Sequence, residues 1–476
     1  MRRTENHLLH PAWTLALPLI AATAVVACPA ERRLFVTIAA AAVYALMQWM
    51  VPKCRFRTDH YFSPVNVALG LLLIKLVVAP MLVMAVDPKN ELFIGMPTRA
   101  SMEGSIAIDV IAYIGLCLGL GFAGEGRAPL ALRVFSTAPG RTTAVIFAAL
   151  GMVGFYLAFG SPGRLTRMLL DPSTMVNTKL GADGGITAFL DTVLRPFFAF
   201  ALVAWWSRSA DREGSATFRA VVAAIGITVA NMTFSFNRAA FVFPLVSLIA
   251  AYSARVRRIS PVATAAALAV MFPLLFMLGG YRAKVLAPPT APAGVGAIEA
   301  SLYEISDTVQ AYAGGPALTG LFLQQQEWGA HPYGGSTLVA SALSPVPIVG
   351  KSFREGSGSA LYNRVLYGMP GYEDQIIPFS AELFVNFHAA GVLAGFFLLG
   401  RLLARAHVWF AAAESSFGAF AIQYMFMWCA MLSVWSLSVV SQIAIYFLGP
   451  VYLYAAAVEV RRWLRGMRVP RLASSY

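Results

Sequence analysis

Long apolar runs recur along almost the whole chain, and most are long enough to cross a lipid bilayer. A spanning helix needs about 20 apolar residues. Twelve runs are predicted as spans, at residues 12–28, 33–51, 64–86, 105–124, 142–160, 186–206, 220–236, 239–253, 261–280, 378–399, 416–435 and 437–458. Only 12% of the 476 residues are charged, about half the share in soluble domains. The sequence therefore predicts an all-α polytopic membrane protein, and it excludes a disordered chain, a collagen and a coiled coil.

Basic residues divide unevenly between the two sides of this predicted bundle. With the N-terminus inside, the inner segments, both termini included, carry 21 Lys and Arg, and the first three outer connections carry 7. This positive-inside pattern predicts that both termini are cytoplasmic. It also explains most of the formal net charge of +13 without nucleic acid. An alternative remains at the start, where residues 25–28 fit a loose lipoprotein cleavage box, but we expect the first helix to be retained.

The connection between the ninth and tenth predicted spans is the largest segment outside the membrane. We expect spans one to nine in residues 1–280, a large periplasmic loop at 281–377, spans ten to twelve in 378–458, and a basic cytoplasmic tail at 459–476. Connections as long as this loop usually carry function. Within it, the spacing of apolar residues predicts a helix near 296–313.

Ionisable residues inside predicted spans are costly to bury and therefore mark candidate sites. Five positions qualify, namely Lys75, Asp191, Arg195, Arg238 and Glu382. Asp191 and Arg195 are spaced i,i+4, which permits a pair on one helix, structural or functional. Three alternatives are open for Lys75, which could extend to the membrane surface, pair with an acid on another helix, or line a path.

Two of these positions lie near the predicted outer surface and suit an anionic substrate. Arg238 could grip phosphate oxygens bidentately, or it could bond carbonyl groups at a helix end. Glu382 and Asn386 share one helix face, so the carboxylate could act as an acid or base in a cavity, or could bond a neighbouring helix. The four cysteines form no cluster with metal-ligand spacing, so neither a metal nor another cofactor is expected.

Two stretches resemble bacterial O-antigen and oligosaccharide repeat-unit polymerases, the Wzy family. Residues 237–244 resemble that family's arginine followed by an aliphatic helix, and residues 335–391 resemble its large outer loop and the helix after it. The family's usual form in that helix is a Glu, an Asn-Phe-Gly and a second Gly. Glu382 and Asn386 fit this form, and His388 stands in place of the first Gly. The resemblance covers roughly the second half of the chain.

The resemblance implies a metal-independent glycosyltransferase that polymerises lipid-linked oligosaccharide repeat units for O-antigen or exopolysaccharide. Such an enzyme transfers the growing glycan from undecaprenyl pyrophosphate to a new repeat unit at the outer face of the bacterial inner membrane. Cationic groups that hold the pyrophosphate and a base for the acceptor hydroxyl would supply the catalysis. Substrate binding is implied for Arg238, Arg282, Lys351, Arg354 and Asn386. The catalytic role is implied for Glu382 or His331.

Two other functions remain open. An O-antigen ligase uses the same donor with a different acceptor. A lipid-linked oligosaccharide flippase, which is a transporter and not an enzyme, would also have about twelve spans, but its halves should resemble each other, and we find no such repeat. The expected partners are undecaprenyl-pyrophosphate-linked oligosaccharides and membrane lipids, with a chain-length regulator as a further candidate and no nucleic acid.

Overall fold

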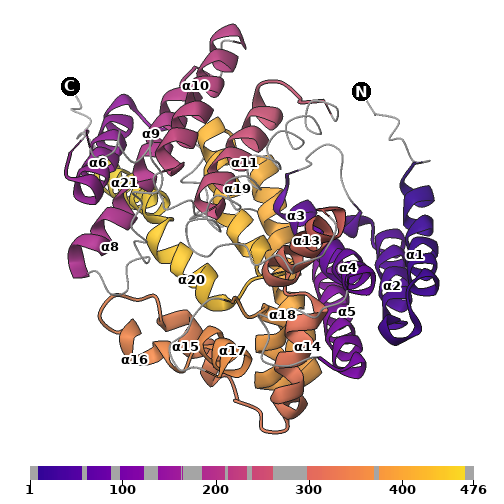
Figure 1. The fold of residues 1–476 in the computed structure, drawn as a ribbon. Coiled ribbons are helices and arrows are strands. Elements are labelled where there is room, and N and C mark those ends of the chain that lie inside the picture. Colours follow the sequence, from indigo (N-terminus) through magenta and orange to yellow (C-terminus); the bar gives the residue numbers. More distant parts are fainter. Residues whose placement is uncertain are drawn as a thin grey trace, which may run out of the picture. The chain divides into compact units, whose positions relative to one another are not determined.

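The computed structural model is all-helical in the part of the chain that it describes. This part comprises residues 9–55, 62–86, 97–122, 138–161, 163, 185–209, 213–232, 238–260, 297–368 and 375–466. Figure 1 shows the helices of the chain. The chain divides into two compact units. The first unit contains residues 1–126, 286–407 and 426–443, and the second contains 127–285, 408–425 and 444–476.

Several helices are long and apolar enough to cross a membrane. There are five, or six when a helix pair bent by 53° is taken as one span. They are Pro64–Ala85, Arg99–Gly121, Arg141–Phe159, Phe189–Ser207, Phe379–Ala412 and the pair Leu437–Tyr446 with Gly449–Arg461. Shorter apolar helices cover Thr14–Ala27, Val36–Met50, Ser215–Ala230, Val242–Arg255 and Ser416–Met431. Each predicted span within the described residues overlaps one of these helices, and the span predicted at 261–280 lies outside them. These helices are those of a multi-pass membrane protein.

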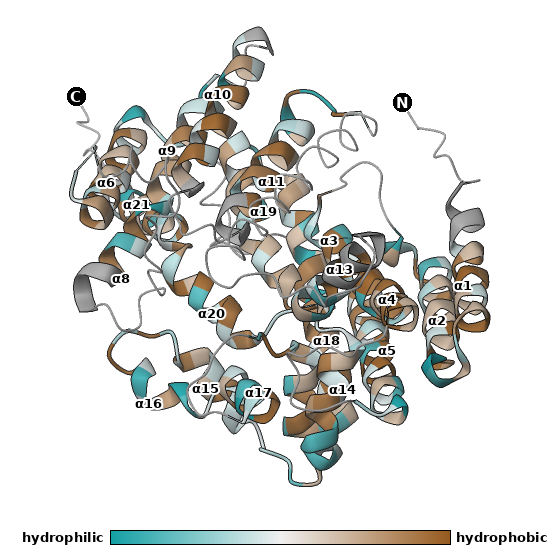
Figure 2. Ribbon diagram, viewed as in Figure 1, coloured by the Kyte–Doolittle hydropathy of each residue, from teal (hydrophilic) through white to brown (hydrophobic). Residues whose placement is uncertain are grey.

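The first unit begins with a bundle of mostly hydrophobic helices (Figure 2). These are α1 (Leu9–Ala27), α2 (Val36–Met50), α3 (Pro64–Leu73), α4 (Ala79–Ala85) and α5 (Arg99–Gly121), and the π-helical segment Ile74–Val78 joins α3 to α4. Polar caps fix two of the starts, because Ser63 Oγ accepts from Asn66 N and Thr98 Oγ1 accepts from Ser101 N, both at 3.2 Å.

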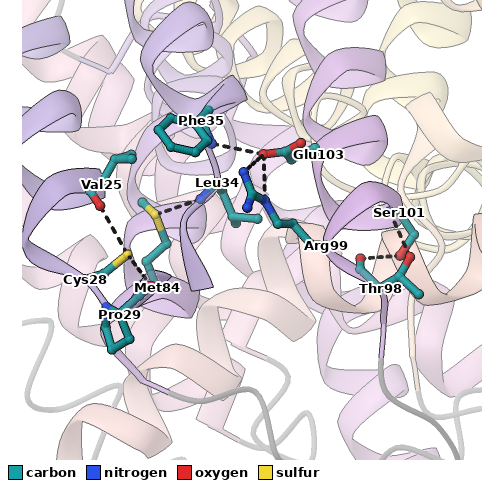
Figure 3. Close-up of polar contacts among 10 residues, drawn as sticks. All are labelled: Val25, Cys28, Pro29, Leu34, Phe35, Met84, Thr98, Arg99, Ser101 and Glu103. Carbon is teal, nitrogen blue, oxygen red and sulfur yellow. Dashed lines mark hydrogen bonds and ion pairs between the residues drawn. The ribbon is translucent and has the colours of Figure 1, made fainter. Parts of the chain in front are cut away.

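Contacts at the two ends of α5 show which connections share a side of this bundle. At its start, Phe35 N donates to Glu103 Oε1 at 3.0 Å (Figure 3), and Thr98 N donates to Gln324 Oε1 at 3.1 Å. At its other end, Lys53 Nζ donates to Gly121 O at 3.4 Å. The α1–α2 connection and the large loop therefore lie at one end of α5, and the α2–α3 connection lies at the opposite end.

The large loop is itself helical and packs against the bundle. Its described elements are α13 (Ala297–Ala313), α14 (Pro316–Gln325), the 3-10 turn Glu327–Gly329, α15 (Ser336–Leu343), α16 (Gly350–Arg354) and α17 (Gly358–Tyr367). The helix predicted near 296–313 is thus confirmed. Gln310 Nε2 of α13 donates to Ala79 O of α4 at 3.1 Å, and Gly320 of α14 lies directly against the backbone of Ser101 in α5.

The helix α18 (Phe379–Ala412) consists of two arms that fold back on each other. Non-helical backbone angles occur at Phe387 and His388. The rings of Phe379 and Phe396 are 5.9 Å apart, and a Cβ at Gly395 would meet the side chain of Leu383. These contacts are impossible in one straight helix, because residues twelve to seventeen apart would be separated by about 18–25 Å. We call residues 379–386 the first arm and residues 389–412 the second arm.

The second arm packs closely against α5. Cβ atoms added at Gly115 and Gly119 would collide with backbone atoms of the second arm, and one added at Gly400 would collide with the backbone of α5. Small residues of this kind let two helix backbones approach. After α18 the chain continues through α19 (Ser416–Met431) and α20 (Leu437–Tyr446).

The second unit contains α6 (Arg141–Phe159), α8 (Gly185–Leu194), α9 (Pro196–Ser207), α10 (Glu213–Met232), α11 (Arg238–Arg255) and α21 (Gly449–Gly466). Its core is rich in edge-to-face aromatic pairs, such as Phe200 with Phe420 at 5.1 Å between ring centroids. Arg195 Nη2 pairs with Asp191 Oδ2 at 3.1 Å on one helix segment. This confirms the pairing that their spacing permits.

Candidate functional site

An open groove of about 1000 Å³ lies in the first unit, within the large loop and beside the turn between the two arms of α18. Its lining residues come from the segment before α15, from α15 to α17, and from the turn between the two arms of α18. They are Tyr333, Gly334, Gly335, Ser336, Thr337, Leu338, Val339, Ala340, Ser352, Phe353, Glu355, Gly356, Leu361, Arg364 and Phe387. The lining thus combines hydroxyl groups and aromatic rings with one arginine and one glutamate.

Two successive glycines shape the wall of this groove. Gly334 and Gly335 have φ angles of 58° and 93°, which glycine adopts without strain. The turn they form is closed by Ser336 N, which donates to Tyr333 O at 3.1 Å, and the chain then enters α15. The groove wall is therefore a tight turn followed directly by a helix.

Asn386, at the end of the first arm, holds this turn in place. Its Oδ1 accepts from Gly335 N at 2.9 Å, and its Nδ2 donates to Thr337 Oγ1 and to Glu382 O, both at 2.6 Å. Tyr333 N adds a bond to Val385 O at 3.0 Å. Asn386 is buried, so the predicted substrate-binding residue lies immediately beneath the groove wall and positions it.

Glu382 is fully buried one turn earlier on the same arm. Its Oε1 accepts from Ser341 Oγ at 2.5 Å, its Oε2 accepts from Leu437 N at 3.3 Å, and Gly358 N donates to the same Ser341 Oγ at 3.0 Å. A Cβ at Gly358 would collide with the carboxylate. Glu382 therefore ties α15, α17 and the start of α20 together in this conformation. Its catalytic role stays a prediction.

The basic and titratable loop residues lie around the groove in different ways. His331 is exposed two residues before Tyr333, Lys351 is exposed on α16, and Arg354 is half-buried on the same helix. None of these three is among the lining residues. Arg364 of α17 is exposed and lines the groove, and its Nη2 donates to Glu355 O at 3.3 Å.

The two remaining predicted ligands cannot be related to the groove. Arg238 is the first residue of α11 in the second unit, and its side chain lies outside the described part of the structure. Arg282 lies outside the described residues altogether. The structure therefore brings together Glu382 and Asn386 from the predicted set, with His331, Lys351 and Arg354 on the same loop.

One buried carboxylate was missed in the sequence. Asp109 lies in the span predicted at 105–124, and its Oδ1 is 2.8 Å from Lys75 Nζ. Of the alternatives open for Lys75, pairing with an acid on another helix is the one observed. The rule that singled out Lys75 applies equally to a carboxylate within an apolar run, so this signal was present in the sequence.

Strained backbone collects beside the groove. His388 has φ 54° and ψ −158°, a region that is almost restricted to glycine. Glu327 and Trp328 also have positive φ angles. The two sites are in contact, because the Phe384 ring packs edge-on against both Trp328 and His388. Strain of this kind concentrates at ligand sites and switches.

Burial raises the pKa of the Tyr362 hydroxyl in α17, so this side chain stays neutral while its ring packs against Phe322 at 4.9 Å. Among the described residues, no group of three His, Cys, Asp or Glu side chains could hold a metal ion.

Comparisons of the chain with protein families, curated proteins and solved structures found no match.

Proposed function

We propose that this chain polymerises lipid-linked oligosaccharide repeat units at the outer face of the bacterial inner membrane. It would transfer the growing glycan from undecaprenyl pyrophosphate to a hydroxyl of a new repeat unit. In this proposal the chain has twelve spans and two cytoplasmic termini, and the large loop is periplasmic. The end of α5 at which the loop packs is then the periplasmic end.

The groove is the observation that carries this proposal. It is open, about 1000 Å³ in volume, and lined by hydroxyl groups, exposed aromatic rings and Arg364. Hydroxyl and guanidinium groups can hydrogen-bond sugar hydroxyls, and ring faces such as those of Tyr333 and Phe387 can cover the apolar faces of sugars. A groove of this composition beside a candidate membrane span suits a saccharide that is attached to a lipid.

The backbone at His388 also supports the resemblance to repeat-unit polymerases. The family's usual residue at this position is glycine, and the φ angle of 54° here is one that glycine adopts without strain. A glycine at this position would therefore fit the turn between the two arms of α18, where this chain carries a histidine.

The proposed roles follow from placement. The groove takes the acceptor repeat unit, and Lys351 and Arg354 on the neighbouring α16 attract the anionic donor. His331 is exposed and can reach solvent, so it is the better placed of the two candidates for the base. Glu382 could act as a base only after leaving Ser341. The pyrophosphate-binding roles of Arg238 and Arg282 rest on the resemblance alone.

Analysis of the glycans of a strain that lacks the gene tests this proposal. We expect single repeat units to accumulate in place of long polymer, and the wild-type gene should restore the polymer. Polymer that stays intact on its lipid carrier would identify a ligase. Repeat units retained on the cytoplasmic face would identify a flippase. Unchanged glycans would refute all three functions.

Two arginine variants test the groove itself. Arg364→Ala should reduce polymer at unchanged membrane abundance, because it removes the arginine of the lining. Arg257→Ala is the matched control, since Arg257 is also exposed but lies in the second unit, outside the groove. Equal amounts of polymer in both variants would refute the role of the groove in binding the repeat unit.

A further inference from the structure

A buried ion pair lies at the start of the first arm of α18. Lys75 Nζ is 2.8 Å from Asp109 Oδ1, and the two side chains are 0% and 3% exposed. Ser380 joins both, because Lys75 Nζ donates to Ser380 Oγ at 2.8 Å and Ser380 Oγ donates to Asp109 Oδ1 at 2.7 Å. Three segments of the chain thus meet in one closed polar triangle among apolar helices. Buried charges in such helices are uncommon and usually have a function.

The helix that carries Lys75 is locally widened. Residues Ile74–Val78 form a π-helical segment, in which Ala79 N bonds to Ile74 O. Pro80 follows directly, and its ring lacks an N–H and would clash with the carbonyl of Leu76 in a regular α-helix. Short π-helical segments recur at functional sites. The widened turn is therefore encoded in the sequence, and it contains Lys75, the cationic member of the triangle.

The first arm connects this triangle to the groove. Ser380 and Glu382 are two residues apart, so about 200° of rotation places them on opposite sides of the helix. Ser380 faces the ion pair, whereas Glu382 bonds Ser341 of α15 and Asn386 bonds Gly335 N at the groove wall. The rotation of this short arm about its helix axis and its position along that axis therefore determine where the groove wall lies.

A second buried pair in the chain differs in this respect. Asp191 and Arg195 lie one turn apart on a single helix segment, with 3.1 Å between Oδ2 and Nη2. They belong to the second unit, whereas the groove belongs to the first. This pair offers a matched control, because its replacement removes the same charges from an apolar helix.

We propose that Lys75 and Asp109 are positioning residues, which act through Ser380 to hold the first arm of α18 and thereby the groove wall. The effect on glycan synthesis rests on the proposed function. The effect on the groove does not, and it can be measured separately.

A reporter cysteine measures the groove directly. Ser352 is exposed and lines the groove. Ser352→Cys should therefore react with a charged maleimide at a rate that depends on the position of the groove wall. Ala100→Cys is exposed at the start of α5, outside the lining, and serves as the reference. The reaction of the parent chain is subtracted, since natural cysteines are present. All measurements use the full chain in membranes.

Two variants break the proposed link in different ways. Lys75→Met with Asp109→Leu replaces the pair by apolar side chains. Proteins often keep their stability when a buried ion pair is replaced in this way. It cannot reproduce the bonds to Ser380. Ser380→Ala leaves the ion pair intact and removes the connection. We expect both variants to change the Ser352→Cys labelling rate several-fold and the Ala100→Cys rate little, whereas Asp191→Leu with Arg195→Met changes neither.

The outcomes separate this inference from the proposed function. Labelling of Ser352→Cys at the wild-type rate in both variants, with normal membrane abundance, overturns the positioning role. If the double variant is absent from membranes, Ser380→Ala decides alone by the same criterion. Polymer yield should fall in parallel with the change in labelling. A strain whose glycans never depend on this chain refutes the proposed function, and the labelling result still tests the positioning role.

Discussion

Replacement of Asn386 by alanine should loosen the groove wall more than any other single change near it. The side chain is buried, and it bonds Gly335 N at 2.9 Å and both Thr337 Oγ1 and Glu382 O at 2.6 Å. Alanine removes all three bonds and supplies no replacement. Two of the partners that lose a bond, Thr337 and Glu382, are buried.

The magnitude follows from those partners. Leaving a buried polar atom without its partner costs about 1–3 kcal/mol. Gly335 is half-buried, so water can satisfy its N–H. With two buried partners affected, Asn386→Ala should reduce the free energy of unfolding by about 2–6 kcal/mol. Asn386→Ala should displace the groove wall more than the rest of the fold, because the turn at Gly335 loses the side chain that anchors it.

A second buried asparagine provides the control. Asn363 of α17 bonds Ser359 O at 2.8 Å, and it bonds both Gln375 O and Gln375 N at 2.7 Å. The melting temperature of purified protein in detergent should fall in both Asn386→Ala and Asn363→Ala. Only Asn386→Ala should also change the labelling of Ser352→Cys. An unchanged melting temperature in Asn386→Ala, or equal labelling in the two variants, would contradict this reasoning.

Three further changes test the strain and packing around the groove by the same melting assay. His388→Gly should raise the melting temperature, because relief of about 1–3 kcal/mol of strain exceeds the 0.5–1 kcal/mol or so by which glycine favours the unfolded chain; a fall would mean that the lost ring contacts dominate. Ile348→Asn should also raise it, since Ile348 has φ 71° and is 94% exposed, so strain is relieved without loss of packing. Gly358→Ala should abolish folded protein by collision with Glu382, whereas Gly356→Ala, with no neighbour closer than 3.6 Å, should fold normally.

The positions of the helices could be predicted from the sequence because the signal is local. A run of about 20 apolar residues has few polar side chains to face water, so it enters the membrane. There a helix satisfies all of its backbone hydrogen bonds, so such a run becomes a helix wherever it occurs. The i,i+4 spacing of Asp191 and Arg195 likewise predicts their pairing, since both partners lie on one helix. The shared face of Glu382 and Asn386 is local in the same way, and the bond from Asn386 Nδ2 to Glu382 O confirms it.

The centre of the first unit could not be predicted in this way, because it depends on contacts between distant segments. Periodicity gives no indication that Lys75 faces Asp109 rather than another acid, or that Ser380 joins them across some 300 residues. The groove has the same origin, since its wall is fixed by a bond between Gly335 and Asn386. His388 gives no turn signal either, because a histidine inside an apolar run is normally read as helix.

The fold-back of α18 brings residues far apart in the sequence within cross-linking distance. The sequence predicts one span at 378–399, in which Phe379 and Phe396 would be about 25 Å apart. Their ring centroids are 5.9 Å apart in the structure. A short bis-maleimide should therefore link Phe379→Cys to Phe396→Cys within one chain, as seen in cross-linked peptides by mass spectrometry. The control pair Ala100→Cys and Leu118→Cys, about 27 Å apart on the uninterrupted α5, should not be linked. Without a link between positions 379 and 396, the first arm would continue straight into the second, and Ser380 could no longer connect the ion pair to the groove.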